Sequence, residues 1–307
     1  MAVAPTNVVT IGTFDGVHLG HRRILDRVNE EAHVHGGDRV AYVFECPPRV
    51  TLEPDPVAGL LLPIDVRQDL LRSFVDRVVI GRFSAVRMLS PRTFTKRVLV
   101  ECLKARAVIV GEGFRFGRAR TGDLASLRTL GEEFGFDVHA VTALCLGGEL
   151  ISSTRIRLLL TAGRVSDAAE LLGRPPILIG EVVAGERIGR KLGYPTANLR
   201  PSPGTLLPAD GIYLVHAYAE TNREHGLLYV GSRPTVGGTD RRCEVHLLSS
   251  ESPNLYEASI EIHLLKHMRD DRTFPSLGAL RAQIELDVKA AGELLPRFPF
   301  SFRPITG

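Results

Sequence analysis

The sequence predicts two domains: an α/β domain with a doubly wound parallel sheet, then a small antiparallel β-barrel with a C-terminal helix. Up to about residue 160, short apolar runs alternate with stretches of helical period, which is typical of a parallel sheet flanked by helices. From about Ile177 onward, strand-like runs follow one another with turn signals between them, which favours a barrel. A length of 307 residues is long for one domain and comfortable for two.

The first domain is expected to contain five strands with helices between them. Ser90 and Pro91 mark the start of one helix, because serine is a good N-cap and proline suits the first helical position. The expected strands are Val8–Ile11, Val40–Phe44, Val78–Ile80, Ala107–Val110 and Val138–Val141. The expected helices are Arg22–His33, Asp65–Phe74, Pro91–Leu103 and Asp123–Phe134.

The second domain is expected to begin at Ile177 and to close with a helix near Leu277–Ala290. A helical stretch, Val165–Leu172, is followed by Arg174-Pro175-Pro176, and together they form the predicted linker. The predicted boundaries are therefore residues 1–164, 165–176 and 177–307. The strand-like runs of the second domain are ILIGEVV, GIYLVHAYA, GLLYVG, CEVHLL and ASIEIHLL.

Composition and charge narrow the class of protein. Charged residues make up 24% and hydrophobic residues 44% of the chain, which is ordinary for a soluble globular protein. The net charge of +3 is too small, and the basic residues are too scattered, to predict nucleic-acid binding. No apolar run approaches the ~20 residues of a membrane span. The opening segment MAVAPTNVVTIG lacks the basic and apolar regions of a signal peptide.

The cysteines predict a reducing compartment. They lie far apart and form no CxxC pair, so we expect reduced, mostly packing residues rather than a metal site or a disulfide framework. With the preceding observations, this favours a cytoplasmic protein that acts on small molecules and has no nucleic-acid or membrane partner. The four residues are Cys46, Cys102, Cys145 and Cys243.

The most informative segment is VVTIGTFDGVHLGH, in which an apolar strand runs into a glycine-rich turn before a helix. Gly12, Gly16 and Gly20 let the backbone turn tightly and approach a ligand. A helix N-terminus favours anionic phosphate, and His18 and His21 add donors for oxygens that gain negative charge. A single histidine at a helix start is usually a capping or solvated residue. Two of them in this turn favour a nucleotide site.

The segment resembles the HxGH signature of the nucleotidyltransferase superfamily. In its extended form, GTFDGVHLGH, it is most similar to the adenylyltransferase half of prokaryotic bifunctional riboflavin kinase/FAD synthetases. The resemblance implies that His18 and His21 stabilise the transition state when FMN attacks the α-phosphate of ATP. It also implies that the turn binds ATP through Gly12, Phe14, Asp15, Gly16 and Gly20.

Two later stretches of the first domain are expected to bind the same nucleotide. The loop VIVGEGFRFGRARTGD is a weak dinucleotide motif by itself, but the matching loop of the family holds the nucleotide, which assigns Gly111 to ATP. The segment ISSTRIR is similar to the family's SSTxxR motif, which acts on the departing pyrophosphate. Its hydroxyl groups can also simply cap a helix. The residues assigned to the phosphates are Ser152, Ser153, Thr154 and Arg157.

The second domain contains GEVVAGERIGRKLGYPTANL, whose glycine spacing is not that of a Walker A loop. Thr196 and Asn198 offer hard oxygen ligands at alternate positions of an extended strand, which suits Mg²⁺. The stretch is very similar to the GRxLG[FY]PTAN signature of riboflavin kinases, and the resemblance places the same two residues at the metal. The residues that it assigns to ATP are Gly185, Gly189, Arg190, Lys191, Gly193 and Pro195.

Two further segments complete the resemblance to riboflavin kinases. Glu244 in RCEVHL matches the family's catalytic base, which accepts the proton of the attacking hydroxyl group. The stretch MRDDRTF is similar to the family's flavin-binding segment and assigns Arg269, Asp271 and Phe274 to the flavin. By itself, a glutamate in a strand is ordinarily solvated, so only the resemblance gives Glu244 this role.

The sequence departs from the family pattern at four places. Pro47-Pro48 stands where a Pro-His-Pro element is usual, Gly113 and Asp271 replace residues that are commonly glutamate or acidic, and Glu257 replaces a glycine. We predict a bifunctional enzyme that uses Mg²⁺ and ATP to convert riboflavin into FMN and FAD, as a monomer or weak homo-oligomer. The alternatives are a riboflavin kinase whose first domain is impaired or acts on a modified flavin, and a non-catalytic regulator that binds flavin or nucleotide.

Overall fold

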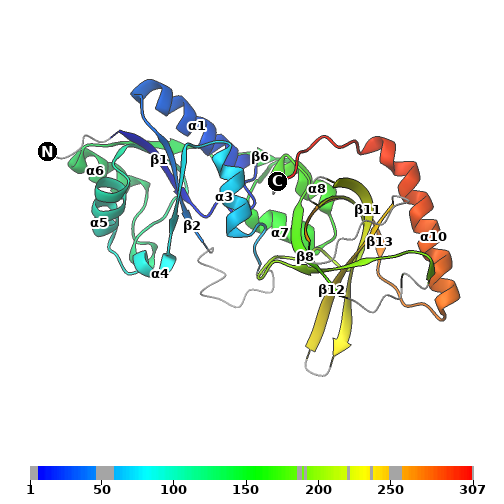
Figure 1. The fold of residues 1–307 in the computed structure, drawn as a ribbon. Coiled ribbons are helices and arrows are strands. Elements are labelled where there is room, and N and C mark those ends of the chain that lie inside the picture. Colours follow the sequence, from blue (N-terminus) through cyan, green and yellow to red (C-terminus); the bar gives the residue numbers. More distant parts are fainter. Residues whose placement is uncertain are drawn as a thin grey trace. The chain divides into compact units, whose positions relative to one another are not determined.

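The chain forms two compact units. The first comprises Met1–Leu60 and Ile64–Ser153, and the second comprises Leu61–Pro63 and Thr154–Gly307. The computed structural model describes residues 6–45, 59–184, 189, 192–219, 222–235, 238–248 and 258–305. The expected fold classes are confirmed, because the first unit holds a parallel sheet with helices and the second a closed antiparallel barrel (Figure 1).

The first unit is built on one five-stranded parallel sheet with strand order β3-β2-β1-β4-β5. The chain adds strands on one side of β1 and then returns to add β4 on the other side. The carboxyl ends of β1 and β4 therefore flank a switch point, where α/β sheets bind ligands. The strands are β1 (Asn7–Gly12), β2 (Arg39–Phe44), β3 (Arg77–Gly81), β4 (Ala105–Gly111) and β5 (Asp137–Val141).

Helices cover both faces of this sheet. On one face α1 packs Val28 and Ala32 against Val8, Ala107 and Ile109. The opposite face is covered by α5, η1 and α6. Both sets of alternating strand residues are therefore buried, as expected for a parallel sheet. The helical segments are α1 (Leu19–His35), α3 (Ile64–Arg72), α4 (Phe83–Val86), α5 (Pro91–Phe94), η1 (Thr95–Cys102), η2 (Arg118–Arg120) and α6 (Leu124–Phe134).

Two predicted helices differ in detail from the observed ones. The helix expected at Pro91–Leu103 begins as predicted, with the Ser90 hydroxyl accepting a hydrogen bond from Thr93 N at 3.2 Å, but continues as the π-helical segment η1. A π-helix is rare, and the apolar spacing of this short segment also fits an α-helix, so periodicity did not reveal it. Asp123 is not inside α6 but caps it, in a capping box with Ser126.

The second unit begins with two helices that precede the barrel. These are α7 (Ser153–Thr161), whose first residue still belongs to the first unit, and α8 (Val165–Leu172). The helix predicted inside the linker is thus present with the predicted bounds. Its residues Val165, Ala168 and Leu171 are buried, so α8 is packed against its surroundings rather than exposed as a tether.

The barrel has six strands in the closed order β10-β11-β12-β9-β8-β13. Five correspond to the expected runs, and the sixth, β9, lies in the PTANL stretch. The helix α10 (Leu277–Leu294) is longer than predicted at its C-terminal end and is followed by η3 (Leu295–Arg297). The strands are β8 (Ile177–Val183), β9 (Ala197–Pro201), β10 (Gly211–Ala219), β11 (Asn222–Thr235), β12 (Gly238–Leu247) and β13 (Ser259–Asp270).

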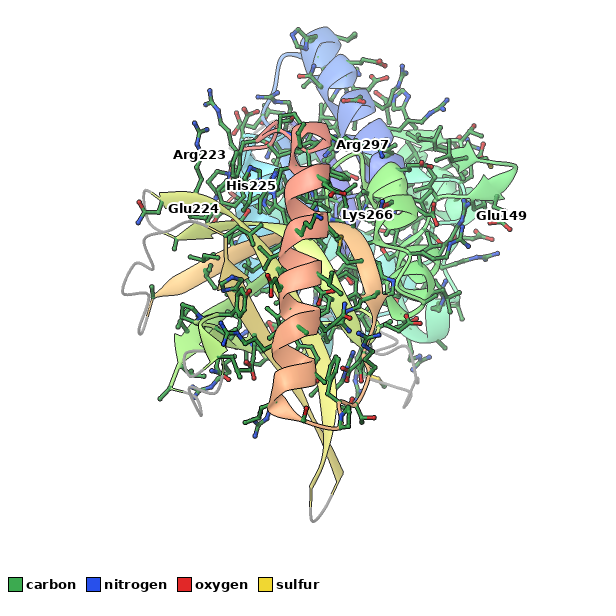
Figure 2. The ribbon with its side chains drawn as sticks, turned by 90° about the vertical axis from the view of Figure 1, so that its right-hand side faces the viewer. Glu149, Arg223, Glu224, His225, Lys266 and Arg297 are labelled. Carbon is green, nitrogen blue, oxygen red and sulfur yellow. The ribbon has the colours of Figure 1, made fainter. Side chains whose placement is uncertain are left out.

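The helix α10 crosses the outer face of the barrel (Figure 2). Along β11 and β12, the fully buried Leu228, Val230 and Val245 fill the interior, and the intervening residues point outward. Leu214, Leu227 and Leu265 form an apolar cluster with Ala291 of α10. Strand and helix residues therefore meet on one outward face, next to the site described below.

The cysteine prediction was only partly correct. Among the described residues, Cys102, Cys145 and Cys243 form no disulfide bond, and the expected reduced state stays a prediction. Cys102 and Cys145 are exposed, however, so only Cys243 is a packing residue, and Cys46 lies outside the described residues. Within the described part of the chain, no helix combines the length and apolar character needed to cross a membrane.

A buried histidine on β10 predicts that acid weakens the barrel. His216 is only 1% exposed, donates from Nε2 to the Phe298 carbonyl oxygen at 3.0 Å, and stacks on Phe300. Burial lowers the pKa of His216 to about 4 from 6.5. As the pH falls below 6.5, the unfolded chain takes up a proton that the folded chain does not, so stability is lost. This histidine should reduce the free energy of unfolding by about 2 kcal/mol at pH 5.

The measurement is chemical unfolding of the chain at pH 7 and pH 5, compared with His216→Gln, which keeps a hydrogen-bond donor. The unmodified chain should lose about 2 kcal/mol more than the variant between these pH values. Equal losses would show that His216 does not contribute to the acid sensitivity.

Candidate active sites

The first candidate site is the turn that joins β1 to α1. His18 is the N-cap of α1, and its Nδ1 accepts a hydrogen bond from His21 N at 3.2 Å. The accepting nitrogen carries no proton, so in the neutral ring the proton lies on Nε2. The two imidazole rings stack with centroids 3.6 Å apart. The predicted pair is thus held together in a defined orientation.

The backbone of this turn is strained and closely packed. Phe14 and Val17 have left-handed φ values of 48° and 41°, which non-glycine residues adopt at a cost in energy. Both side chains are buried and hold the turn in place. At Gly20 a Cβ atom would lie 3.2 Å from the His18 ring, so a larger residue would disturb this histidine. The glycine spacing read from the sequence therefore has a steric basis at this position.

Arg67 of α3 holds the turn between β1 and α1 through hydrogen bonds, and no sequence signal pointed to this residue. Its fully buried guanidinium group donates to the carbonyl oxygens of Thr13 at 2.5 Å, Phe44 at 3.2 Å and Glu45 at 3.0 Å. It therefore ties the glycine-rich turn to the end of β2. In the sequence it is one arginine on an ordinary amphipathic helix, and only tertiary contacts reveal its position.

We expect Arg67→Leu to lower the free energy of unfolding by about 2–4 kcal/mol, because buried carbonyl oxygens lose a charged donor. Chemical unfolding followed by circular dichroism measures the effect. The matched control is Arg72→Leu on the same helix, where the side chain is 60% exposed and, among the described residues, forms an ion pair only with nearby Asp69. That variant should change stability by less than about 0.5 kcal/mol. An equal effect of both substitutions would contradict the bridging role of Arg67.

The environment of His21 keeps its ring neutral. Loss of solvation, followed by electrostatic interactions with His18 and Arg67, holds the pKa of His21 well below its usual range. Its Nδ1 is shielded from water and has no hydrogen-bond partner among the described residues. A buried polar atom of this kind is rare in folded proteins unless a ligand completes its hydrogen bonding. The turn therefore has the features of a binding site for an anionic group.

The other nucleotide residues predicted for the first domain lie at the carboxyl end of β4 and at the start of α7. Gly111 ends β4, beside β1 in the sheet. The Ser153 hydroxyl donates to the carbonyl oxygen of Asp15 at 2.8 Å and so contacts the turn directly. Ser152 precedes it, whereas Thr154 and Arg157 follow on α7 in the second unit.

Of the positions considered next, at which the sequence departs from the family pattern, the structure describes Gly113 but not Pro47, Pro48 or Glu257. Gly113 is exposed and a side chain there would meet open space, so this position leaves room for a larger residue. Pro47 and Pro48 lie outside the described residues, as does Glu257 in the second unit.

The second candidate site is a cavity of about 310 Å³ between the outer face of the barrel and α10. Three separate motifs meet there: the PTAN segment, the strand of Glu244, and the MRDDRTF segment. Each is far from the others in sequence, so their convergence supports a common site. The predicted residues that line the cavity are Gly189, Thr196, Glu244, Arg269, Asp271 and Phe274.

Strand register places the carboxylate of this site. Glu244 of β12 lies directly opposite Asn198 of β9 on one side and Tyr229 of β11 on the other. Residues paired across strands point to the same face of the sheet. The Thr196 hydroxyl donates to Glu244 Oε2 at 3.0 Å, which orients the carboxylate. Asn198 points to the same face of the sheet as Glu244 but does not line the cavity.

The segment before β9 is closely packed at Gly189. A Cβ atom there would lie 2.3 Å from the Tyr194 carbonyl oxygen and 3.2 Å from the Thr196 hydroxyl oxygen, so glycine is required for this arrangement. Gly193 has a φ of 88°, a left-handed value that also favours glycine, and Pro195 accepts a hydrogen bond from His246 at 2.8 Å. The predicted ATP residues Gly185, Arg190 and Lys191 lie outside the described residues.

The other end of the cavity combines charged and aromatic groups. The Tyr229 hydroxyl donates to Asp271 Oδ2 at 3.2 Å, and burial together with the Asp271 charge raises the pKa of Tyr229 to about 12. The shorter carboxylate of Asp271 thus has a defined partner. The Phe274 ring lies 5.0 Å from the Arg272 guanidinium and 5.9 Å from that of Arg269. These groups offer a stacking surface with hydrogen-bonding groups beside it.

Arg269 is fixed by a partly buried ion pair that the sequence did not predict. Its guanidinium group contacts Asp287 of α10 through Nε at 3.0 Å and Nη2 at 2.8 Å. Gln283 also donates to Asp287 at 2.7 Å. The pair joins the end of β13 to α10, so the helix that covers the cavity also positions one of its walls.

The two units define a two-domain transferase of flavin cofactor synthesis, with a nucleotidyltransferase turn in the first and a kinase-type barrel site in the second. Residues 2–155 match the FAD synthetase family model and residues 172–295 the riboflavin kinase model. The chain belongs to the bifunctional riboflavin kinase/FMN adenylyltransferase family.

Two relatives and one solved structure are similar to this chain over nearly its whole length. The bifunctional riboflavin kinase/FMN adenylyltransferase of Escherichia coli strain K12 is 36% identical over 289 residues, covering 93% of this chain and 92% of the relative. The protein of the same name from Pseudomonas fluorescens is also 36% identical, with 94% and 92% covered. A crystal structure titled macrolide-efflux protein from Streptococcus pneumoniae superposes with a TM-score of 0.85 at 28% identity, covering 97% and 96% of the two chains.

Proposed function

We propose that the chain converts riboflavin into FAD in two ATP-dependent steps. The barrel phosphorylates riboflavin to FMN with release of ADP, and the α/β domain joins FMN to AMP with release of pyrophosphate. The observation that carries the proposal is the convergence of Thr196, Glu244 and the flavin segment on one cavity. The stacked histidines of the first unit support the second activity.

In the kinase step, Glu244 accepts the proton of the terminal hydroxyl group of riboflavin. The freed oxygen attacks the γ-phosphorus of ATP, and the bond to the bridging oxygen of ADP breaks. Thr196 holds the carboxylate through the 3.0 Å hydrogen bond and so directs it at the substrate. The flavin ring binds beside Arg269, Asp271 and Phe274, at the other end of the cavity.

The donors around Glu244 fit a magnesium ion bound with ATP. Thr196 and Asn198 supply neutral hard oxygen atoms. The Thr196 hydroxyl group donates its hydrogen bond to Glu244, so the lone pairs of the hydroxyl oxygen are available to a cation. Thr196 and Asn198 are the residues that would hold the ion. When bound, Mg²⁺ neutralises negative charge on the phosphates. We assign the triphosphate to the preceding loop: Gly185, Gly189, Arg190, Lys191, Gly193 and Pro195.

In the adenylyltransferase step, a phosphate oxygen of FMN attacks the α-phosphorus of ATP directly, and pyrophosphate leaves. His18 and His21 donate N–H groups to the α-phosphate oxygens as their charge grows. Without nucleotide the His21 ring is neutral, and a neutral imidazole can donate one N–H group to an α-phosphate oxygen. The turn residues Gly12, Phe14, Asp15, Gly16 and Gly20, with Gly111, are assigned to the nucleotide. Ser152, Ser153, Thr154 and Arg157 are assigned to the leaving pyrophosphate.

The deciding experiment incubates the purified chain with riboflavin, ATP and Mg²⁺ and separates riboflavin, FMN and FAD by chromatography. Accumulation of FAD supports both steps. FMN alone would support the alternative of a riboflavin kinase with an impaired first domain and would direct attention to Pro47, Pro48 and Gly113. Formation of neither product would overturn the proposal and favour a binding role or a modified flavin.

We further propose that the enzyme is cytoplasmic, acts as a monomer or weak homo-oligomer, and takes small molecules rather than nucleic acid as partners. Both proposed steps use ATP and a flavin, which are small molecules. We also retain 1–164 and 177–307 as the functional domains, joined by residues 165–176.

A further inference from the structure

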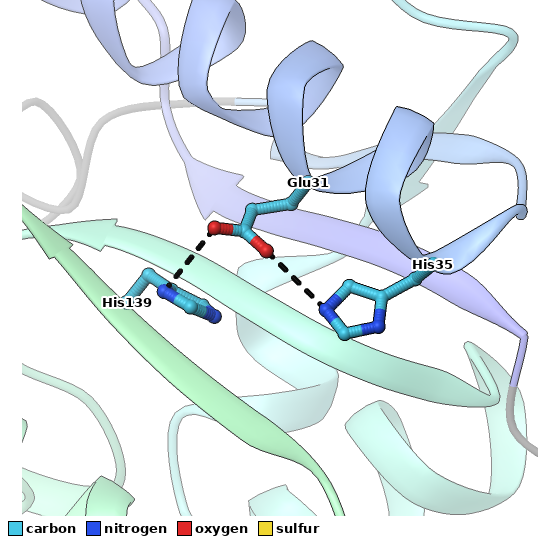
Figure 3. A group of neighbouring side chains, drawn as sticks. All are labelled: Glu31, His35 and His139. Atoms are coloured by element: carbon cyan, nitrogen blue, oxygen red, sulfur yellow. Dashed lines mark ion pairs between the residues drawn. The ribbon is translucent and has the colours of Figure 1, made fainter.

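We propose that Glu31, His35 and His139 form a binding site for a first-row transition-metal ion such as Zn²⁺. Glu31 and His35 lie one turn apart near the C-terminal end of α1, and His139 projects toward them from β5 (Figure 3). One ligand atom from each of the three lies within 4.8 Å of the others. All three residues belong to the first unit, so the cluster is part of one packed body.

The spacing of the donor atoms suits a tetrahedral ion. His35 Nε2 lies 3.3 Å from Glu31 Oε2, and His139 Nδ1 lies 3.4 Å from Glu31 Oε1. Zinc bonds of about 2.0–2.1 Å in tetrahedral geometry place neighbouring ligand atoms about 3.3–3.4 Å apart. The two histidine nitrogens approach different oxygens of the carboxylate, so rotation of the Glu31 carboxylate or of one ring is needed to bring all three ligand atoms onto one ion.

Burial and charge also favour a cation. Glu31 is 5% exposed, so its carboxylate is costly to hide without compensating positive charge. The rings of His35 and His139 keep 20% and 30% of their surface accessible, which leaves a route for the ion and for a water molecule as fourth ligand. Arg27 also contacts Glu31, but it pairs with Glu30 at 2.9 Å as well and keeps that partner when a metal binds.

The donor set defines the class of ion and separates the cluster from the catalytic sites. Two imidazole nitrogens and one carboxylate suit Zn²⁺, Co²⁺ or Ni²⁺, whereas Mg²⁺ prefers oxygen ligands. Glu31 lies thirteen positions after His18, the N-cap of α1, which corresponds to about 20 Å along the helix. A bound ion would therefore join the end of α1 to β5 and stabilise the first unit, independently of either proposed reaction.

The test uses the full chain, freed of metal with a chelator and studied without nucleotide. Zinc binding is measured by calorimetry, and the thermal midpoint is measured with and without Zn²⁺. The variants are His35→Ala and His139→Ala. The matched control is His33→Ala on the same helix, an exposed histidine whose ring contacts only the Asn29 carbonyl oxygen among the described residues. Circular dichroism checks that each variant is folded, and His139→Asn replaces His139→Ala if that variant is not.

We expect one zinc equivalent to bind at least tenfold more weakly to the His35 and His139 variants than to the unmodified chain and the control. The rise in thermal midpoint on adding Zn²⁺ should disappear in the same variants only. Substituted Co²⁺ should show the intense visible absorption of tetrahedral coordination. Equal zinc binding in all proteins, or equal loss in the control, would overturn the proposal and leave the cluster as an ion-pair network.

Discussion

Replacing Glu244 with glutamine is expected to lower the kcat of FMN formation by about 10²–10⁴-fold, the usual contribution of a positioned general base. Glutamine keeps the shape of the side chain and can still accept the hydrogen bond from Thr196. It cannot take the proton of the attacking hydroxyl group. The KM for riboflavin should change little, because the proposed flavin position is at the other end of the cavity. Steady-state assays of FMN formation at saturating ATP measure both constants.

Two controls show whether this loss is specific to the kinase step. The same variant should make FAD from supplied FMN at the normal rate, since that reaction belongs to the first unit. Glu181→Gln removes an exposed carboxylate from β8 of the same barrel and should leave FMN formation unchanged. If E244Q kept more than a tenth of the normal kcat, Glu244 would not be the base.

Removal of the second histidine of the HxGH turn has the next largest expected effect. His21→Ala should lower FAD formation from FMN by about 10²–10³-fold, which is typical for loss of one donor to developing negative charge. The substitution leaves the His18 cap in place, because that hydrogen bond uses the backbone N–H of residue 21. FMN formation in the barrel should be unaffected. Assays of FAD formation from FMN and ATP measure the loss.

The pH dependence of this step gives an independent check. Burial and electrostatic interactions with His18 and Arg67 hold the pKa of His21 below its usual range, so the ring stays neutral as the pH falls through 6.5. FAD formation should therefore show no loss from His21 titration between pH 8 and pH 6.5.

The control for His21→Ala is His33→Ala, which removes an exposed histidine of α1 and should keep full activity. An unchanged FAD rate in His21→Ala would exclude a catalytic role.

Local motifs were predictable because short-range chemistry determines them. The HxGH turn needs glycine where a Cβ atom would strike the His18 ring, and that requirement is visible in the spacing alone. The Ser90 cap was also predicted from its neighbours, whereas Asp123 was expected inside the helix that it in fact caps. The alternation of strand and helix periods was enough to place five strands of the sheet. The strand β9 was harder, because a glycine- and proline-rich loop precedes it and hides its period.

The residues that complete each site were not predictable, because their partners come from distant parts of the chain. Arg67 reaches Thr13 across 54 positions, and Tyr229 reaches Asp271 across 42. Arg269 and Asp287 meet only because α10 folds back over the end of β13. None of these pairs leaves a periodic or local signal in the sequence.

The sequence by itself determined the family and the order of the two domains, and it predicted the reactive groups, because residue type and short-range spacing encode that chemistry. Tertiary structure alone decided which buried arginine supports the histidine turn, which tyrosine faces the flavin segment, and which histidines surround Glu31. Those contacts depend on strand register and on how helices pack over the strands, and both are set by the burial of apolar surface across the whole domain.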